Sequence, residues 1–302
     1  EPLAAAIAET GAEVSVISMR GGGLFFALKL MADLCRLRPG IISSHLNRAS
    51  LAAGLIGKLC RVPSISHIHG LNNQSYYRFS DCLIAVSKAV NEHLATQNTA
   101  HRNIRVIANR IDKPALAPKK TAGEPLRLVI TAKLHKNKGH LWALEAIARN
   151  IGQIGDIRIT ILGEGPERTA LEKYCNNSCL KNRVVFHGFV KDPEAFYPDI
   201  DIAMLPSLGE GIPLSLLEAM RWGIPCIASR IGGIPEIVED GQNGILVAPG
   251  NEASLIEAIR QVRCDYARFS SAAVERFKIV NNYPAMIDEF EDLLLQNMRA
   301  KK

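Results

Sequence analysis

The sequence predicts an α/β protein built from two doubly wound parallel-sheet lobes that face a shared cleft. The chain has 302 residues, more than one core usually organises, which indicates two domains. Short β-rich apolar runs alternate with helix-like stretches in both halves, a pattern typical of parallel sheets covered by helices. A proline-rich stretch separates the halves.

In the first half, strand and helix patterns alternate along the chain. Runs of β-branched and apolar residues predict strands, and apolar residues at helical spacing predict the helices between them. The expected strands are residues 13–18, 40–44, 64–68, 82–86 and 104–107, and the expected helices are residues 2–9, 24–36, 49–60 and 88–95. We therefore expect a first Rossmann-like lobe over residues 1–115.

The second half repeats the pattern and ends in an amphipathic segment. Its expected strands are residues 126–131, 157–162, 184–187, 202–205, 225–228 and 245–247. The stretch 112–125 contains three prolines, so we place the domain boundary inside it and a second lobe over residues 116–282. Residues 283–302 are expected to form a helix that packs back on a lobe through one apolar side, formed by Met286, Ile287, Phe290, Leu293 and Leu294.

Composition narrows the class of protein. The chain is 47% hydrophobic and 22% charged, which excludes disordered, collagen-like and coiled-coil proteins. No apolar run reaches the roughly 18 residues that a membrane span needs. Seven scattered cysteines fit a reducing compartment, so we expect a cytoplasmic protein.

Charge is concentrated in the first half. Residues 1–115 hold 13 Lys and Arg against 7 Asp and Glu, whereas residues 116–302 hold 23 of each. A basic lobe suits an anionic partner such as a lipid headgroup surface or a phosphorylated glycolipid, although a merely solvated face remains the alternative. A peripheral contact with the inner face of the membrane is therefore a hypothesis. Nucleic acid is not expected, because the basic half lacks interleaved aromatics.

The most informative stretch is residues 205–220, where a strand ends and a Pro/Ser/Gly turn follows. Pro213 stands where a helix would begin, since its fixed φ suits the first turn. A helix start at the carboxyl edge of a sheet offers free backbone N–H groups and a positive dipole end to a phosphate or sugar oxygen. These groups lie near Gly211, Ile212 and Leu214.

Two acids flank this helix start. Glu210 precedes the turn and Glu218 lies eight residues later, and carboxylates accept hydrogen bonds from pairs of hydroxyls in sugars and ribose. The motif Glu210-Gly-Ile-Pro-x4-Glu218 resembles the E-x7-E signature of the family 4 retaining glycosyltransferases, which have the GT-B fold of two facing Rossmann-like lobes. Gly232-Gly233-Ile-Pro-Glu236 is similar to a further motif of that family. The resemblance implies that Glu218 binds the ribose of a nucleotide sugar and that Glu210 lies against the donor sugar.

A basic loop follows the strand expected at residues 126–131. Lys133 and Lys138 lie in it together with other basic-capable side chains, and such a group would neutralise a diphosphate whose charge grows as the glycosidic bond breaks. The family usually has Arg at the position of Lys133, so the resemblance assigns the diphosphate to both lysines and more firmly to Lys138. We therefore expect catalysis without a metal or another cofactor. The D-x-D sequence Asp199-Ile-Asp201 precedes its strand and is interpreted as a capping turn.

Histidines in the first lobe are further candidates. The strand expected at residues 64–68 leads into His69, and the resemblance places His69 against the donor sugar, as a catalytic residue with Glu210 and Lys138. His45 and Arg48 follow the preceding strand and could line the acceptor side of the cleft. The family opens with a strand and a Gly-rich loop that we expect to be missing here, because Gly21-Gly-Gly23 follows the second expected strand and lacks G-x-G-x-x-G spacing.

The leading hypothesis is a retaining hexosyltransferase. It would move a sugar from a UDP- or GDP-type donor to the hydroxyl of a glycolipid or glycan, in the assembly of lipopolysaccharide or another cell-surface polysaccharide. Two other classes stay open on the residues alone. One is a GT-B phosphorylase or sugar-nucleotide hydrolase, and the other is a catalytically silent or truncated GT-B binding module. The absence of a dinucleotide fingerprint argues against an NAD-dependent enzyme.

Overall fold

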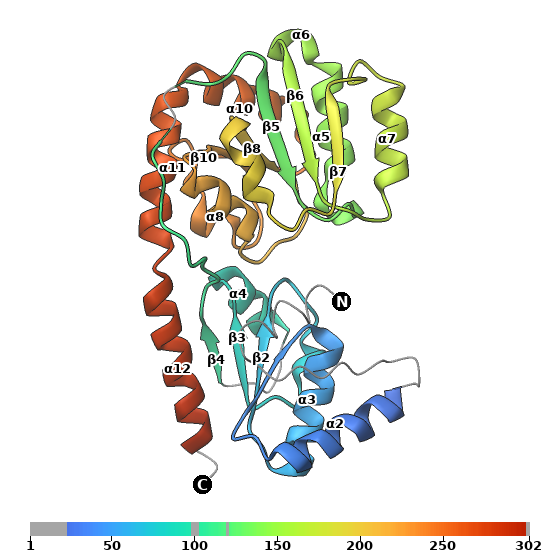
Figure 1. Cartoon of the computed structure of the whole chain (residues 1–302), viewed down its shortest axis with the longest axis vertical. Coiled ribbons are helices and arrows are strands. Elements are labelled where there is room, and N and C mark those ends of the chain that lie inside the picture. The colour runs from blue at the N-terminus through green and yellow to red at the C-terminus, as the bar shows by residue number, and fades with distance from the viewer. Residues whose placement is uncertain (1–22, 98–102, 119–120, 300–302) are drawn as a thin grey trace.

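The computed structural model describes residues 23–97, 103–118 and 121–299, which form two α/β lobes stacked end to end (Figure 1). The N-terminal lobe contains a four-stranded sheet in the order β1-β2-β3-β4, and the C-terminal lobe contains a six-stranded sheet in the order β10-β9-β8-β5-β6-β7. All the strand pairs are parallel. The predicted class of two doubly wound parallel-sheet lobes is confirmed.

The N-terminal lobe alternates short strands with helices. Its helices are α2 (Gly23–Leu37), α3 (Asn47–Cys60), the 3-10 helix η2 (Gln74–Tyr77) and α4 (Lys88–Thr96), and its strands are β1 (Ile42–His45), β2 (Ser64–Ile68), β3 (Cys82–Ala85) and β4 (Ile104–Val106). The Ser87 hydroxyl caps α4 by accepting a hydrogen bond from the Val90 N–H at 3.0 Å, as expected of a serine before a helix. The expected helix 2–9 and strand 13–18 lie outside the described residues.

The C-terminal lobe is larger and repeats the strand-helix pattern. Its strands are β5 (Leu126–Thr131), β6 (Ile157–Leu162), β7 (Val184–Gly188), β8 (Ile202–Leu205), β9 (Cys226–Ser229) and β10 (Gly244–Val247). Its helices are the 3-10 helix η3 (Lys136–Lys138), α5 (His140–Arg149), α6 (Ile151–Ile154), α7 (Arg168–Asn176), the 3-10 helix η4 (Pro193–Asp199), α8 (Leu214–Arg221), α9 (Ile234–Ile237), α10 (Glu252–Cys264) and α11 (Tyr266–Val280). The last helix, α12 (Tyr283–Arg299), continues the line of α11 down to the other lobe (Figure 1).

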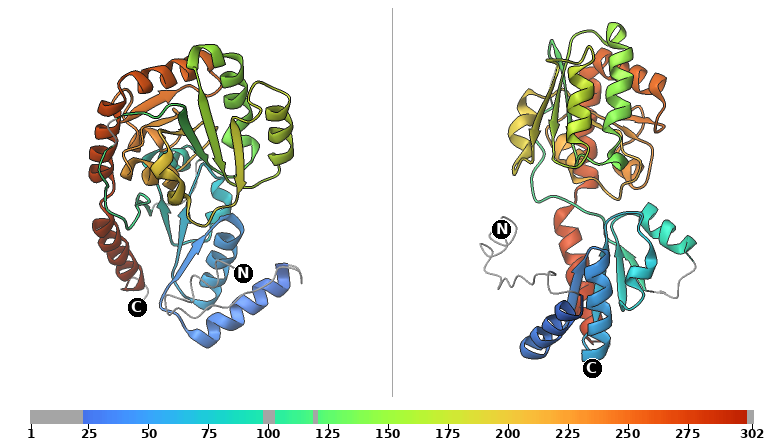
Figure 2. Two further views of the ribbon diagram at one scale, coloured as in Figure 1. Left: turned by 45° about the horizontal axis from the view of Figure 1, so that its top comes forward. Right: turned by 90° about the vertical axis from the view of Figure 1, so that its right-hand side faces the viewer.

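Helices bury both faces of the six-stranded sheet. Alternate residues of β5 point to opposite sides, so Leu128 and Ile130 join a core with α5, α7 and α10, while Val129 joins a second core with α8 and α11. This division follows from the two-residue repeat of a strand. Figure 2 shows helices on either side of this sheet. The C-terminal lobe is therefore a complete three-layer structure.

The four-stranded sheet is covered differently on its two faces. One face packs Ile68, Leu83 and Ala85 against α4 and η2. The other face packs Ile65 and Ile84 against α12, whose Leu293 is 4% exposed. The expected apolar side of the last helix thus packs on the N-terminal lobe. Among the described residues, no helix is both long and apolar enough to span a membrane.

Within the part of the chain that the structure describes, the backbone passes between the lobes at two places, and these two crossings are hydrogen-bonded to each other. The first crossing is the segment between β4 and β5, and the second is the junction between α11 and α12. At the junction, the Asn281 side chain accepts a hydrogen bond from the Ile111 N–H and donates one to the Ile111 carbonyl, both at 2.9 Å. Both crossings lie along the same side of the molecule (Figure 1). We call this pair of crossings the hinge.

One detail of the predicted helix start is corrected. Pro213 is not the first helical residue but the residue before it, with φ −77° and ψ 112°, and α8 begins at Leu214. The ring still fits, since the N-cap residue of a helix takes extended backbone angles.

Candidate active site

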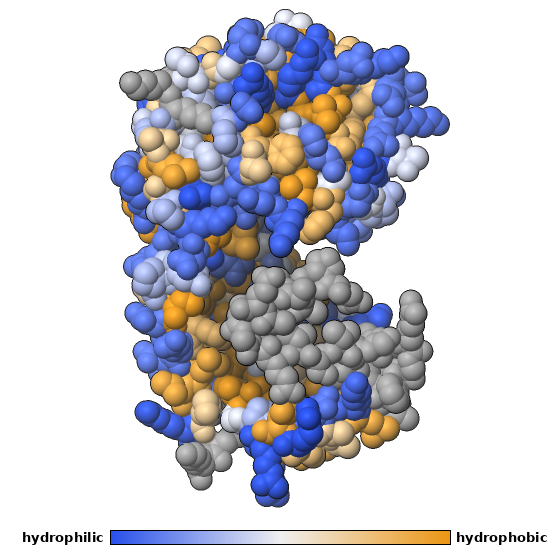
Figure 3. Space-filling view, viewed as in Figure 1, coloured by the Kyte–Doolittle hydropathy of each residue, from blue (hydrophilic) through white to orange (hydrophobic). Residues whose placement is uncertain are grey.

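The carboxyl ends of the strands in both lobes are directed at the interlobe region. β5 leads into the basic loop 132–139, β8 into the loop 206–213, and β2 into His69. Ligands of open α/β sheets bind at this edge. Figure 3 shows hydrophilic residues along the lower edge of the C-terminal lobe, with apolar residues gathered over the centre of that lobe.

Lys138 and Glu210 form the central pair of the site. The Lys138 ammonium donates to Glu210 Oε1 at 2.6 Å, and the Ser207 hydroxyl donates to the same oxygen at 2.7 Å. The side chains of Lys138 and Glu210 are 21% and 11% exposed, so solvent screens the pair less than it would an exposed one. The two predicted catalytic residues of the C-terminal lobe are therefore in direct contact.

Backbone contacts hold the basic loop against the Glu210 loop. The Leu208 N–H donates to the Asn137 carbonyl at 2.7 Å, and the Trp142 indole N–H donates to the Pro206 carbonyl at 3.0 Å. Gly139 has φ +70°, and a Cβ there would lie 1.9 Å from the Pro206 oxygen. Glycine is thus required at this position for two reasons, the left-handed backbone and the close approach.

The start of α8 presents unpaired backbone donors. Within the described part of the chain, the N–H groups of Gly211, Ile212 and Leu214 donate to no protein acceptor. The backbone there is packed tightly between the lobes, since a Cβ on Gly211 would lie 2.4 Å from the His69 carbonyl oxygen. These three amides can donate to an anion or a sugar hydroxyl at the cleft.

A hydrogen-bonded link between the lobes lies next to this site. The Glu236 carboxylate accepts hydrogen bonds from the Lys88 and Ala89 N–H groups at 3.1 and 3.0 Å. These two amides belong to the first turn of α4 in the opposite lobe, where a negative charge is favourable. We call this contact the Glu236 latch.

Glu218 lies within α8, half-buried below the helix start. It accepts a hydrogen bond from the Tyr197 hydroxyl at 3.4 Å. Burial raises the pKa of Glu218, and the nearby Glu194 carboxylate raises it further. The carboxyl group of Glu218 therefore gains a proton at a higher pH than an ordinary glutamate does.

A cavity of about 470 Å³ opens at the carboxyl ends of β5 and β6. Lys133 and Thr131 line it from the β5 side, and Pro193 lines it from η4, the element that also carries Tyr197. The remaining wall is mainly apolar and consists of Ala132, Leu162, Gly163, Glu164, Phe189 and Val190. Its volume is within the range usual for small-molecule sites, roughly 300–1,000 Å³. We call it the β5 cavity.

The predicted residues of the C-terminal lobe therefore lie at different places along the cleft. Lys138 and Glu210 touch each other, Lys133 lines the β5 cavity, and Glu218 contacts Tyr197 of η4. The wall of the β5 cavity contains none of the other three residues. The arrangement is a row of groups along the sheet edge and not a single enclosed pocket.

Three histidines stack at the carboxyl edge of the N-terminal sheet. His45 Nδ1 lies 2.8 Å from His69 Nε2, and the His45 and His67 ring centroids are 4.1 Å apart. Burial lowers the pKa of His67 to about 3, with added repulsion from the two neighbouring histidines. Burial also lowers the pKa values of His45 and His69. The three rings are consequently neutral at pH 7 and can donate and accept hydrogen bonds.

Two predicted positions lie apart from these groups. Arg48 is exposed in the first turn of α3 and lines neither the β5 cavity nor the cavity beside the three histidines. The Asp201 carboxylate accepts hydrogen bonds from the Gly123 and Arg127 N–H groups at 2.9 and 2.8 Å. Asp201 thus fixes the end of the interlobe segment, and among the residues described no group of three or more His, Cys, Asp or Glu side chains is arranged to hold a metal ion.

Several residues of the site were not predicted. Tyr197 and Trp142 carried no motif, and their roles depend on contacts between distant segments. Ser207, the partner of Glu210, lies three residues before it in the same turn, a spacing that could have suggested a side-chain contact. Glu236 belongs to a recognised motif, but its contact with α4 joins residues more than 140 positions apart.

The fold and this site define a class of protein, the two-lobed GT-B transferases. The UDP-glucose-bound and UDP-bound forms of HepE from Anabaena have the same fold: the complex with UDP and glucose superposes with a TM-score of 0.79 at 21% identity, covering 91% of this chain and 83% of that one. Two family models match adjacent stretches, Glycosyltransferase Family 4 over residues 13–113 and Glycosyl transferases group 1 over residues 125–265. The chain belongs to the family 4 glycosyltransferases.

Several curated relatives are named as glycosyltransferases of lipopolysaccharide or colanic acid biosynthesis. The chain is 27% identical to the lipopolysaccharide 1,6-galactosyltransferase of Escherichia coli K12, over 71% of this chain and 59% of that protein. It is also 27% identical to the UDP-Gal:alpha-D-GlcNAc-diphosphoundecaprenol alpha-1,3-galactosyltransferase of Escherichia coli, over 84% of this chain and 75% of that protein. WcaL of Salmonella typhimurium, named for colanic acid biosynthesis, is 30% identical over 72% of this chain. The chain spans 57% of the length of WcaL.

Proposed function

We propose that this protein transfers a hexose from a nucleotide diphosphate sugar to a hydroxyl acceptor with retention of configuration. The observation that carries the proposal is the Lys138–Glu210 pair beside the free amides at the start of α8. A cation and oriented N–H groups at one edge of a sheet are what a departing diphosphate requires. UDP is the favoured nucleotide, because one relative and several fold neighbours are named with UDP or UDP-sugars. A GDP-sugar is included in the test as the alternative donor.

The donor would lie along the sheet edge of the C-terminal lobe. The β5 cavity would take the nucleoside, with Glu218 accepting from the ribose hydroxyls through the form of its carboxyl group that is ionised. Lys133 and Lys138 would bind the diphosphate, and Glu210 would accept from the donor sugar while its pairing with Lys138 fixes both side chains. No metal is required in this proposal, because the lysines and the amides supply the positive charge.

The reaction balances without a further reagent. The bond between the anomeric carbon and the diphosphate oxygen breaks, and a bond forms between that carbon and the acceptor oxygen on the same face of the sugar. The acceptor proton passes to the departing diphosphate. The neutral ring of His69, a residue whose backbone carbonyl lies next to Gly211, would hydrogen-bond the donor sugar. The acceptor would be a glycolipid or glycan hydroxyl on the side of the N-terminal lobe, where His45 and the basic surface lie.

Nucleotide release from named donors tests the proposal. The protein is incubated with UDP-galactose, UDP-glucose, UDP-N-acetylglucosamine or GDP-mannose and a glycolipid acceptor, and free nucleotide is measured. We expect Lys138→Ala and Glu210→Gln each to lower the rate by about 10²–10³-fold, the usual effect of removing a group that stabilises developing charge. Lys181→Ala, an exposed lysine of the same lobe, is the matched control. Unchanged release in Lys138→Ala would contradict the proposal.

The configuration is tested on the product. We expect NMR of the isolated product to show the same anomeric configuration as the donor. An inverted product would exclude the same-face mechanism while leaving sugar transfer itself in place. Release of nucleotide without acceptor glycosylation would indicate a hydrolase instead.

A further inference from the structure

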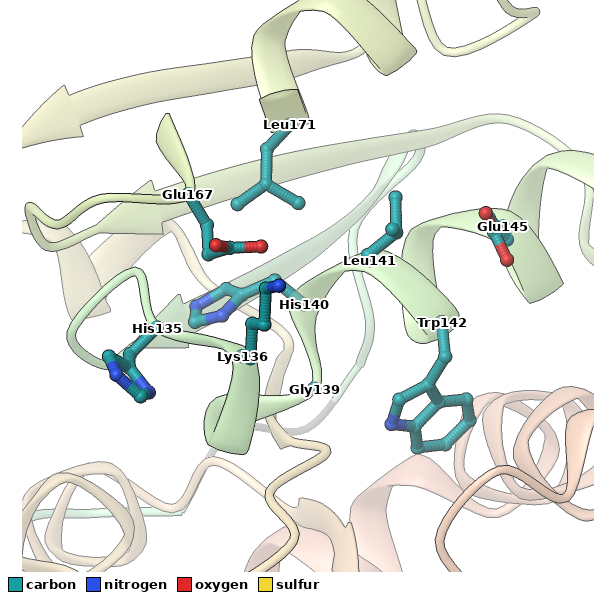
Figure 4. Close-up of a pocket in the computed structure, with 9 residues that line it drawn as sticks. All are labelled: His135, Lys136, Gly139, His140, Leu141, Trp142, Glu145, Glu167 and Leu171. Carbon is teal, nitrogen blue, oxygen red and sulfur yellow. The ribbon is translucent and has the colours of Figure 1, made fainter. Parts of the chain in front are cut away.

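A cavity separate from the β5 cavity lies behind the basic loop. It has a volume of about 280 Å³ and opens between the start of α5 and the start of α7. Its wall is formed by His135, Lys136, Gly139, His140, Leu141, Trp142, Glu145, Glu167 and Leu171. Figure 4 shows the His140 ring in this wall with Glu167, Lys136 and Leu171 around it. We call it the α5 cavity.

His140 is the unusual member of this wall. Its residue exposure is 3%, and within the part of the chain that the structure describes neither ring nitrogen has a hydrogen-bond partner. Burial lowers the pKa of His140 to about 4, with a smaller contribution from Lys138, so the ring is neutral at pH 7. A neutral imidazole offers one N–H donor and one nitrogen acceptor. Buried polar groups are almost always paired, and both nitrogens are covered in this structure, so a bound group would reach the ring after a side chain of the wall has moved.

The charges of the wall indicate what kind of group this is. Glu145 and Glu167 bring two carboxylates against the single ammonium of Lys136, which disfavours an anion such as phosphate. The same carboxylates accept hydrogen bonds from hydroxyls. A hydroxyl can also both donate to and accept from a neutral imidazole, which neither a simple anion nor a cation can do. The polar part of the wall therefore fits a neutral molecule with several hydroxyl groups.

The apolar part of the wall narrows the class further. Leu141, Leu171 and the Trp142 indole border the same space. A pyranose has C–H faces that pack on aliphatic and aromatic side chains, while its hydroxyls point outward to polar partners. The volume of about 280 Å³ lies at the small end of ligand sites, roughly 300–1,000 Å³, and suits a single ring better than an extended chain.

We propose that the α5 cavity is a saccharide subsite that binds one neutral pyranose, with His140 and Glu167 as its hydrogen-bonding residues. Its role as a holding site for one unit of a glycan acceptor or product rests on the proposed transferase function, but the binding itself does not. The subsite shares Gly139 with the loop that carries Lys138, so a bound saccharide lies directly behind the residues proposed to hold the diphosphate.

Ligand-observed saturation-transfer NMR on the full chain tests the subsite. The probes are methyl α-D-glucopyranoside, methyl α-D-galactopyranoside and N-acetylglucosamine, each with and without saturating UDP. We expect at least one pyranose to receive saturation and to keep its signal when UDP is present. Inorganic phosphate, followed through its ³¹P signal, is the probe for an anion site. Binding of phosphate in place of a pyranose would overturn the proposal, as would loss of the pyranose signal with UDP.

Two variants locate the binding. His140→Leu removes both nitrogens while keeping a similar size, and we expect it to weaken pyranose binding by about fivefold or more, the effect of losing one hydrogen bond. Leu141→Phe narrows the cavity from its exposed wall, where Leu141 is 40% exposed, and leaves His140 in place. Leu55→Phe, a 44% exposed leucine of α3 in the other lobe, is the matched control.

The outcomes separate this proposal from the transferase proposal. Pyranose binding that both cavity variants weaken and Leu55→Phe leaves intact supports the subsite, whether or not nucleotide sugars are turned over. If no pyranose binds, or if binding survives both cavity variants, the cavity holds ordered water only and the subsite is refuted. A failure of nucleotide release, by contrast, would refute the transferase and leave the pyranose result standing.

Discussion

Both lobes are parallel sheets covered by helices, but they differ in how much of the core is formed by segments of the same lobe. In the C-terminal lobe, two large cores bury both faces of a six-stranded sheet, and the loops with Lys138 and Glu210 are hydrogen-bonded to each other. In the N-terminal lobe, one face of a four-stranded sheet is covered by α12, which arrives from the far end of the chain. The first lobe thus relies on the second for part of its own core.

Under the proposed function, this difference in core structure suits the two lobes to separate roles. A rigid lobe suits a site in which charged groups must be fixed before the ligand arrives. A lobe held by a hinge, a helix and the Glu236 latch can shift as a unit with little internal change. The proposed donor groups lie on the rigid lobe, and the histidines of the proposed acceptor side lie on the other.

The largest expected effect is on the C-terminal core. Leu144 is fully buried in the core beneath α5, and we expect Leu144→Ala to lower the free energy of unfolding by about 2–5 kcal/mol. Leu293→Ala, at the smaller contact of α12, should cost about 2 kcal/mol, because its partly exposed neighbours can relax into the space. Both tryptophans, Trp142 and Trp222, lie in the C-terminal lobe, so their fluorescence in urea follows that lobe while circular dichroism follows both. Equal losses in the two variants would contradict the comparison.

Removing the Glu236 latch should have the second-largest effect. Glu236→Ala removes two hydrogen bonds to the first turn of α4, and we expect the closed arrangement to lose about 1–3 kcal/mol. X-ray scattering should show a larger radius of gyration, while the unfolding of the C-terminal lobe stays unchanged. Glu239→Ala is the control, since Glu239 pairs with Gln242 and Arg276 of its own lobe. An unchanged radius would mean that the latch does not hold the lobes together.

Loosening the hinge should have a smaller effect. Asn281→Ala removes the paired hydrogen bonds with Ile111, and we expect a loss of about 1–2 kcal/mol from the contact between the crossings. Hydrogen exchange at residues 107–118 should speed up in this variant and stay as it is in Asn282→Ala, whose side chain only caps the start of α12. Equal protection in both variants would show that the crossings are held by other contacts.

The smallest expected effect on stability comes from Glu218, a residue of the proposed donor site. Because its pKa is raised, Glu218 adds stability when protonated at low pH, and this contribution is lost as pH rises through its folded pKa. Glu218→Gln should therefore raise the melting temperature slightly at pH 7. The same variant should weaken UDP binding by about tenfold, because an ionised acceptor is lost. Calorimetric titration and thermal melts measure the two effects, with Glu172→Gln, at a partly exposed residue of α7, as the control.

UDP affinity of the native protein should also depend on pH. The proposal uses the ionised form of Glu218, so affinity should fall as pH drops through its raised pKa, at a higher pH than an ordinary glutamate would give. In Glu218→Gln this decline should disappear. A decline of the same shape in the variant would assign the titration to another group.

Much of the fold could be predicted from local patterns. The bounds of β2, β5, β6 and β8 agree with the sequence prediction because each is a short β-branched apolar run ended by a turn. β1 was expected at residues 40–44 and is found at Ile42–His45. The first two residues, Gly40 and Ile41, precede the ladder, since pairing with β2 begins at Ile42. Strand ends depend on a neighbouring strand, which a local pattern does not contain.

The site was predicted less completely for a physical reason. Lys138, Glu210 and Glu218 lie in motifs whose positions at strand ends follow from the alternation of elements. The positions of the residues that orient these side chains do not follow from that alternation. Tyr197 reaches Glu218 from η4, and Trp142 reaches Pro206 across two loops, so these contacts arise only when the sheet has formed.

The position of the two crossings determines the side from which the proposed acceptor would enter. The interlobe segment and the α11–α12 junction run along one side of the molecule and are tied together by Asn281 (Figure 1). Two lobes that are connected along one side leave the opposite side of the cleft open. The proposed glycan or glycolipid acceptor would therefore enter from the side away from the α11–α12 column.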